Sequence, residues 1–146
     1  MTLQINRPTL DALLAHLERA YPEEGAGFLL GRTENGARRV SALVEVANAR
    51  EDTARHNRFL ITPQDTIRAE DEADRLGLEL LGVFHSHPDC PNVPSEFDRQ
   101  WALPWFSYTI TRVDGGAAVS TRSWRLSDDR ETYHEERVEI VPGPAN

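Results

Sequence analysis

The sequence predicts an α/β fold in which a single mixed, mostly antiparallel sheet has helices packed against it. Three observations support this fold class. Helix-like and strand-like segments alternate along the chain, one strand near the middle is apolar on both faces, and turn signals at 34–36 and 114–116 indicate two hairpins. The 146 residues suffice for one domain, which we place at 1–141, followed by a disordered tail at 142–146.

The first third of the chain predicts a strand, a helix and a hairpin. Residues 2–5 alternate polar and apolar side chains, which is typical of a short edge strand. Leucines recur at helical spacing over 8–20 and form one apolar stripe, and Pro22 stops this helix. An apolar run at 28–30 then predicts a buried strand, and the alternating residues 39–47 predict its return partner.

The middle of the chain predicts a loop, a helix and a central strand. Residues 48–58 are polar, and 59–61 predict a short strand. Thr62 and Pro63 are typical of a helix start, so we expect a helix from there to Leu76.

The segment Leu78–His87 is apolar on both faces, as expected for a strand covered on both sides. Side chains of a strand alternate between its two faces. We therefore expect Leu78, Leu80, Gly82 and Phe84 on one face of this strand. The opposite face would carry Leu81, Val83, His85 and His87.

The last third predicts a short helix, a hairpin and an edge strand. The helix begins at Pro94-Ser95 and ends before Pro104, and the hairpin strands are 106–113 and 117–126. The segment 127–136 is too charged to be core, whereas 138–141 could add an edge strand.

Composition narrows the classes of function. Cys90 is the only cysteine, so an intrachain disulfide is excluded, which fits a reducing cytosol. The N-terminus lacks a signal-peptide pattern, and no stretch approaches the ~20 apolar residues of a membrane span. The net charge of −8 should repel nucleic acid and anionic membranes. We therefore expect a cytoplasmic protein that acts on small molecules or proteins, and the sequence leaves a homodimer open.

Two histidines at the end of the central strand predict a metal site. His85 and His87 are two residues apart, which places both rings on one face with Cα atoms about 6.6 Å apart at ~3.3 Å per residue. Rings at this separation can converge on one zinc ion at ~2.0–2.1 Å. The alternative is a pair of histidines that are merely packed or exposed at a strand end.

A serine and an aspartate follow on the next helix. Ser95 and Asp98 are three residues apart and therefore share one helical face. Asp98 can supply a third ligand and leave the fourth position of a tetrahedral zinc ion to water, as in catalytic zinc sites. The alternative is a capping box, in which the two residues only stabilise the start of the helix.

Together these residues resemble the signature of the JAB/JAMM (MPN-plus) zinc metalloproteases. In His85-Ser86-His87-Pro88, Pro94-Ser95 and Asp98, both spacings match that family, with seven residues between His87 and Ser95 and two between Ser95 and Asp98. The segment 21–31 resembles the upstream family segment that carries a glutamate, and counting from Gly27 places this glutamate on Glu24 rather than Glu23. The similarity extends over roughly residues 8–126, and the chain resembles the compact prokaryotic members.

The resemblance implies a fold, a site and an activity. The fold would be the JAB/MPN domain, a deaminase-like layer architecture. One zinc ion would be held by His85, His87 and Asp98, with Glu24 as general base and Ser95 as hydrogen-bond donor to the oxyanion. The substrate would be an amide or isopeptide bond at the C-terminal tail of a ubiquitin-like β-grasp protein or a sulfur carrier of the ThiS or MoaD kind.

Several alternatives stay open. One is a catalytically inactive MPN-type scaffold without metal, and another is a zinc hydrolase of small peptides or cysteine adducts. A third follows from His85-x-His87-x-Asp89, which resembles the start of a metallo-β-lactamase ligand motif, although Cys90 stands where that motif has a histidine. Cys90 itself is either an ordinary loop thiol or a redox-sensitive block of the metal.

Overall fold

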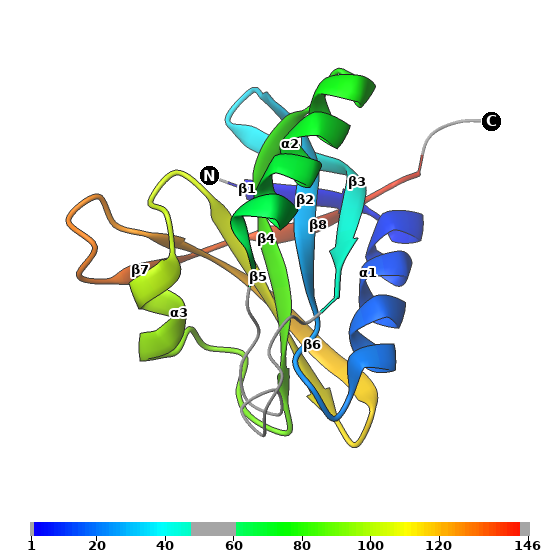
Figure 1. Ribbon diagram of the computed structural model, residues 1–146, viewed down its shortest axis with the longest axis vertical. Coiled ribbons are helices and arrows are strands. Elements are labelled where there is room, and N and C mark those ends of the chain that lie inside the picture. Colours follow the sequence, from blue (N-terminus) through cyan, green and yellow to red (C-terminus); the bar gives the residue numbers. More distant parts are fainter. Residues whose placement is uncertain (1, 48–60, 144–146) are drawn as a thin grey trace.

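The computed structural model describes residues 2–47 and 61–143. Within these residues the chain forms three helices and eight strands, and all eight strands belong to one sheet (Figure 1). The helices are α1 (Arg7–Ala20), α2 (Pro63–Leu76) and α3 (Glu96–Trp101). The strands are β1 (Thr2–Asn6), β2 (Ala26–Glu34), β3 (Ala37–Val46), β4 (Glu79–Pro88), β5 (Ser107–Asp114), β6 (Ala117–Leu126), β7 (Tyr133–Glu136) and β8 (Val138–Val141).

The sheet is mixed, as the sequence predicts. Its strand order is β7-β6-β5-β4-β2-β3-β1-β8. The β1–β3, β1–β8 and β4–β5 pairs are parallel, and the other four pairs are antiparallel. Strand β4 lies in the middle and is buried along most of its length, which confirms the prediction of a central strand. Strand β1 is not an edge strand, because β8 pairs with its outer side.

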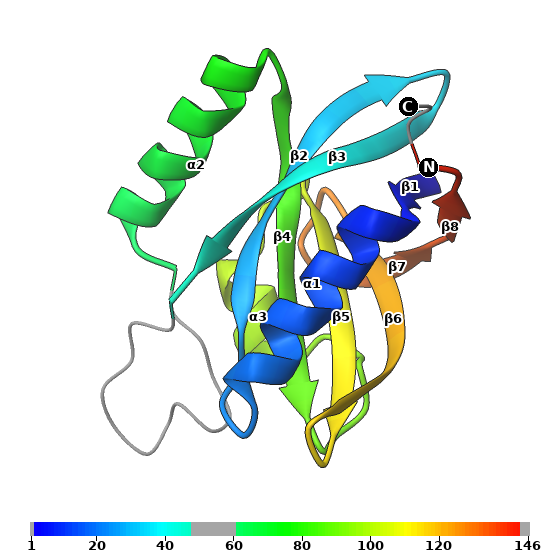
Figure 2. The same ribbon diagram turned by 90° about the vertical axis from the view of Figure 1, so that its right-hand side faces the viewer.

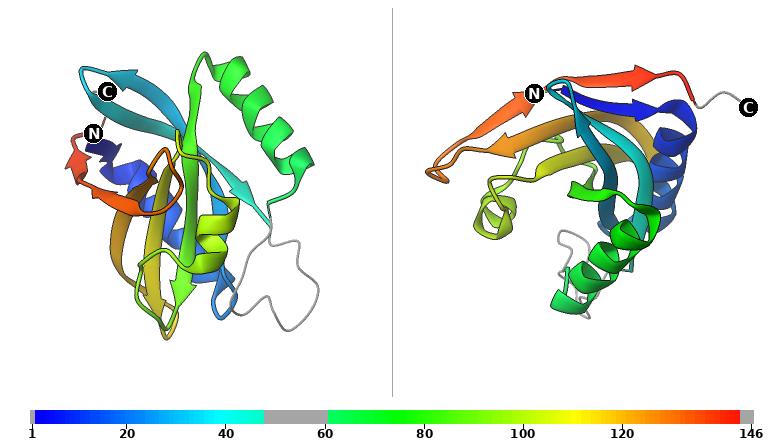
Figure 3. Two further views of the ribbon diagram at one scale, coloured as in Figure 1. Left: turned by 90° about the vertical axis from the view of Figure 1, so that its left-hand side faces the viewer. Right: turned by 90° about the horizontal axis from the view of Figure 1, so that it is seen from above.

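The last two strands connect the two edges of the sheet. Strand β7 pairs with β6 at one edge and β8 pairs with β1 at the other, with only Arg137 between them. The sheet is therefore curled into a partly closed barrel (Figure 3). The prediction that 127–136 contributes nothing to the core was wrong. Glu136 is buried, and its carboxylate accepts hydrogen bonds from the hydroxyl groups of Ser107 and Ser123.

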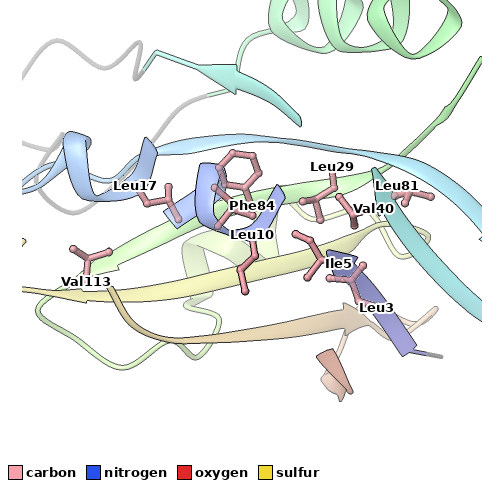
Figure 4. Packing of buried hydrophobic residues seen from close by; sticks show 10 residues of the cluster. Leu3, Ile5, Leu10, Leu17, Leu29, Val40, Leu81, Phe84 and Val113 are labelled. Carbon is pink, nitrogen blue, oxygen red and sulfur yellow. The ribbon is translucent and has the colours of Figure 1, made fainter. Parts of the chain in front are cut away.

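Two hydrophobic clusters cover the two faces of the sheet. Helix α1 lies across one face (Figure 2), where its leucines pack in the cluster shown in Figure 4. Helix α2 covers the other face through Ala69 and Ala73. Both helices begin with a side-chain cap. Thr62 accepts a hydrogen bond from the amide of Asp65, as predicted, and Asn6, which was not predicted as a cap, accepts one from the amide of Thr9.

A β-bulge in β4 changes the predicted alternation. Gly82 pairs with Leu29 and Leu80 pairs with Leu30, so Leu81 is an extra residue in the register. Leu81 consequently packs in the α1 cluster with Phe84, while Leu80 joins the α2 cluster. The prediction that Leu81 shares a face with His85 and His87 was therefore wrong, although the alternation after the bulge is regular.

Three predicted segments fall wholly or partly outside the described residues. These are the loop at 48–58, residues 59 and 60 of the strand predicted at 59–61, and residues 144–146 of the tail. Among the residues that the structure describes, no helix has the length and apolar character needed to cross a bilayer.

Candidate metal centre

The two imidazole rings of β4 converge, as the spacing predicts. The Nε2 atoms of His85 and His87 are 3.2 Å apart, and both rings are buried. His87 Nδ1 lies 2.8 Å from the carbonyl oxygen of Pro91. A carbonyl oxygen only accepts hydrogen bonds, so Nδ1 of His87 carries a proton. When the ring is neutral, this tautomer leaves the lone pair on Nε2, the nitrogen that faces His85 and Asp98.

Helix α3 brings the carboxylate of Asp98 to the same point. Its Oδ1 lies 3.3 Å from His85 Nε2, and its Oδ2 lies 3.3 Å from His87 Nε2. The capping box is also present, because Oδ2 accepts a hydrogen bond from the amide of Ser95 at 2.7 Å. The two interpretations of this pair are therefore compatible. Capping holds the carboxylate in the position from which it faces both rings.

Glu24 enters the site from the turn between α1 and β2. It is buried, and one ligand atom from each of Glu24, His85 and His87 lies within 4.8 Å of the others. Two hydrogen bonds fix the neighbouring residue: the amide of Gly25 donates to Ser86 Oγ at 2.8 Å, and the amide of Ser86 donates to the carbonyl of Gly25. The structure thus joins segments 61 residues apart in sequence. Ser86 lies between the two histidines on the opposite face of β4, and the sequence alone predicted no role for it.

The surroundings shift the pKa values of the three proposed ligands in different directions. Burial lowers the pKa of His85, which keeps this ring neutral. Burial also opposes charge on His87, but its hydrogen bonds to Asp98 and to the Pro91 carbonyl raise its pKa overall. The pKa of Asp98 lies well below its usual range, because the two imidazoles and the Ser95 amide outweigh its burial. An ionised carboxylate and neutral imidazoles are the forms that bind divalent metals.

The donor set fits a tetrahedral zinc ion. Ligand atoms ~2.0–2.1 Å from such an ion lie about 3.3 Å from one another. The two nitrogens are 3.2 Å apart, and each lies 3.3 Å from a different oxygen of Asp98. Two imidazole nitrogens and a carboxylate are typical zinc ligands, so this arrangement can hold a metal ion, with the carboxylate of Glu24 close to both rings.

Other predictions around the site need correction or stay open. His16 on α1 is not part of the site, since its ring contacts Phe84 edge-on and its Nε2 hydrogen-bonds the carbonyl of Ala26 at 2.9 Å. Asp89 accepts hydrogen bonds from Tyr21 and the amide of Gly115, which argues against the metallo-β-lactamase alternative. Cys90 is an exposed residue whose sulfur is partly desolvated. This desolvation and the nearby charge of Glu24 raise the pKa of the thiol, which disfavours the reactive thiolate.

Fold and site together define a small domain with a zinc-type donor set at the end of a central strand. The family model described as prokaryotic homologs of the JAB domain matches residues 6–127. The chain therefore belongs to this family of prokaryotic JAB-domain proteins.

Curated relatives agree with this membership. The chain is 32% identical to a probable TtuB-protein conjugate cleaving protease of Thermus thermophilus, over 79% of this chain and 73% of the relative. It is 29% identical to a desampylase of Haloferax volcanii, over 83% and 86% of the two chains. It is 26% identical to a CysO-cysteine peptidase of Mycobacterium tuberculosis, over 95% and 91%.

Solved structures agree with the fold. A solution structure from Desulfitobacterium hafniense superposes with a TM-score of 0.83 at 27% identity, covering 97% of this chain and 94% of the other. A JAB1/MPN domain protein from Archaeoglobus fulgidus gives a TM-score of 0.56 at 19% identity, covering 95% and 99%. At that identity the second likeness concerns the fold alone.

Proposed function

We propose that this protein is a zinc-dependent peptidase that hydrolyses an amide or isopeptide bond at the C-terminal tail of a ubiquitin-like or sulfur-carrier protein. The observation that carries the proposal is the spacing of His85, His87 and Asp98, which matches a tetrahedral zinc ion, with the buried Glu24 beside it. The names of the relatives, which refer to TtuB conjugates, desampylation and CysO-cysteine, support the substrate class.

The residues divide the chemistry among them. A zinc ion held by His85, His87 and Asp98 would supply Lewis-acid activation of water near neutral pH. The carboxylate of Glu24 takes a proton from the water that attacks the carbonyl carbon and passes it to the leaving amine. Ser95 donates its O–H to the carbonyl oxygen as negative charge develops there.

The hydroxyl group of Ser95 is suited to this task. In the capping box Ser95 Oγ accepts a hydrogen bond from the amide of Asp98 at 3.1 Å, which uses a lone pair of the oxygen. Its O–H proton remains available for donation. Ser95 is also exposed, so a substrate carbonyl can reach it.

The geometry favours an enzyme over the scaffold alternative. A scaffold without metal has no need for two buried imidazoles and a buried carboxylate that face one another, since their burial is costly without a cation between them. The alternative of a hydrolase for cysteine adducts uses the same chemistry. A carrier with a C-terminal cysteine is therefore included in the test as a second substrate.

The test uses purified protein with two kinds of carrier substrate, one extended by an amide-linked peptide and one carrying a C-terminal cysteine. We expect zinc-loaded wild type to release the free carrier, as measured by intact mass, and chelated protein to release none. Glu24→Gln should retain zinc and lose about 10²–10⁴-fold in kcat, because it removes the general base.

Glu23→Gln is the matched control, since it makes the same change at the adjacent residue and should leave kcat unchanged. His85→Ala should lose both zinc and activity. Cleavage that persists after complete removal of metal would contradict the proposal, as would full activity of Glu24→Gln.

A further inference from the structure

The loop between β4 and α3 contains a buried asparagine that the proposed chemistry does not use. Asn92 is 5% exposed, whereas its neighbours Pro91 and Val93 are both exposed. A polar side chain buried between two exposed residues is held there by specific hydrogen bonds. Its surroundings therefore indicate what it positions.

The side chain of Asn92 joins the loop to two strands of the sheet. Its Nδ2 donates to the carbonyl oxygens of Ile110 on β5 and Ser120 on β6, at 3.3 and 3.1 Å, and lies 3.0 Å from Ser120 Oγ. Both carbonyls only accept hydrogen bonds, so this network fixes which way the amide group points. The main-chain carbonyl of Asn92 in turn accepts a hydrogen bond from the indole of Trp124 at 3.2 Å.

The residue just before Asn92 contacts the metal site. The carbonyl of Pro91 accepts the Nδ1 proton of His87 at 2.8 Å, which directs Nε2 toward His85 and Asp98 and makes it the nitrogen with the lone pair when the ring is neutral. A hydrogen-bond partner of this kind sets the tautomer and orientation of a ligating histidine. Because Pro91 is exposed, its position depends on what holds the loop on either side.

We propose that Asn92 is a positioning residue that fastens the 89–95 loop to β5 and β6, so that the Pro91 carbonyl holds His87 in its metal-binding tautomer. The inference rests on the proposed function, since it assigns His87 as a ligand. It adds a residue outside the ligand set that the metal site requires. Asn92 acts on this site indirectly, through the carbonyl of Pro91 and the ring of His87.

The experiment compares Asn92→Ala with Thr121→Val in the full-length protein. Thr121 Oγ1 hydrogen-bonds Thr111 Oγ1 at 2.8 Å across the same two strands, so Thr121→Val weakens β5–β6 through a hydrogen bond in which the loop takes no part. In the metal-free proteins, at a pH high enough for His87 to be neutral, long-range ¹H–¹⁵N correlation of the imidazoles should show the Nδ1–H tautomer of His87 in wild type and Thr121→Val. Asn92→Ala should show a mixture of tautomers.

Zinc affinity gives a second measurement. In competition with a chromogenic chelator, Asn92→Ala should bind zinc about 10–100-fold more weakly than wild type, the range typical for loss of such supporting contacts. Thr121→Val should bind as wild type does. If Asn92→Ala fails to fold, Trp124→Phe removes the indole donor to the same loop, keeps an aromatic ring in its place, and should weaken zinc binding in the same direction.

The two measurements keep the inference separate from the proposed function. Asn92→Ala with the Nδ1–H tautomer and wild-type zinc affinity would overturn the inference and leave Asn92 a plain loop anchor. If wild type cleaves no carrier substrate, the proposed function fails, but the tautomer in the metal-free protein still decides whether Asn92 positions His87.

Discussion

Ser95 combines helix capping with the proposed donation to the oxyanion, and comparison with a second capping residue can distinguish the effects of these two roles. Ser95→Ala removes the cap of α3 as well as the hydroxyl donor. We expect it to lower the free energy of unfolding by about 0.5–2 kcal/mol and kcat by about 10²–10³-fold. Ser95→Thr keeps both functions and should retain most of the activity.

The matched control for this prediction is Thr62→Ala on α2. Thr62 forms the same kind of capping box with Asp65, away from the metal site. The Thr62→Ala variant should therefore lower the free energy of unfolding to a similar extent, as measured by urea denaturation, and leave kcat unchanged. Equal losses of kcat in both variants would show that Ser95 acts through stability alone.

At the scale of elements, α3 is too short to hold Asp98 in place by itself. The helix has six residues, well below the length at which an isolated helix is stable in water. Arg130, from the turn before β7, compensates for this by donating to the carbonyls of Arg99 and Ala102, and Arg99 donates back to its carbonyl at 2.7 Å. These bonds satisfy carbonyl groups that the end of a helix leaves unpaired.

Replacing Arg130 should therefore weaken the metal site from a distance. We expect Arg130→Met to fray the end of α3 and to increase the rate at which zinc dissociates, measured by transfer to a chelator. Arg122→Met is the control, because Arg122 pairs only with the exposed Glu135 in the contacts described for its guanidinium and lies over Trp124. Identical dissociation rates in the two variants would show that the caps on α3 do not support Asp98.

The sequence predicted those elements whose signals are local. Caps, turn residues and leucine spacing located α1, α2 and the β5–β6 hairpin to within one or two residues, and strand alternation placed His85 and His87 on one face. The β4 bulge was missed because an extra residue in the register depends on the partner strand, not on the sequence of β4. The Arg130 contacts were missed for a similar reason, since they join α3 to a turn about 30 residues away.

At the scale of the molecule, curling of the sheet encloses charge as well as apolar surface. Arg38 on β3 is buried and donates to the carbonyl of Leu81 and to Ser107 Oγ at 2.9 and 3.0 Å. Ser107 Oγ donates in turn to the carboxylate of Glu136, at the end of the strand that closes the barrel. The burial of Glu136 was not predicted, because the density of charge in 127–136 does not show which carboxylate has hydrogen-bond donors inside the fold.

The closure of the barrel should therefore make stability depend on pH through Glu136. Burial raises the pKa of Glu136, although bonds from Ser107 and Ser123 and the charge of Arg38 oppose this. The folded protein thus holds this proton more tightly than the unfolded chain does. The associated stability is fully present below the unfolded pKa of about 4.3 and is lost as pH rises through the folded pKa.

Glu136→Gln cannot ionise and should not show this loss. Its free energy of unfolding relative to wild type should rise between about pH 4 and about pH 7, by about 1.4 kcal/mol for each unit by which the pKa is raised. Urea denaturation of the metal-free proteins measures this difference. Glu135→Gln removes the same charge from the adjacent residue, where hydrogen bonds from Arg122 lower the pKa. The stability of this variant relative to wild type should therefore fall as pH rises toward the unfolded pKa of about 4.3 and stay nearly constant above about pH 5. Parallel pH profiles for wild type and Glu136→Gln would mean that closing the barrel leaves this carboxylate as well solvated as it is in the unfolded chain.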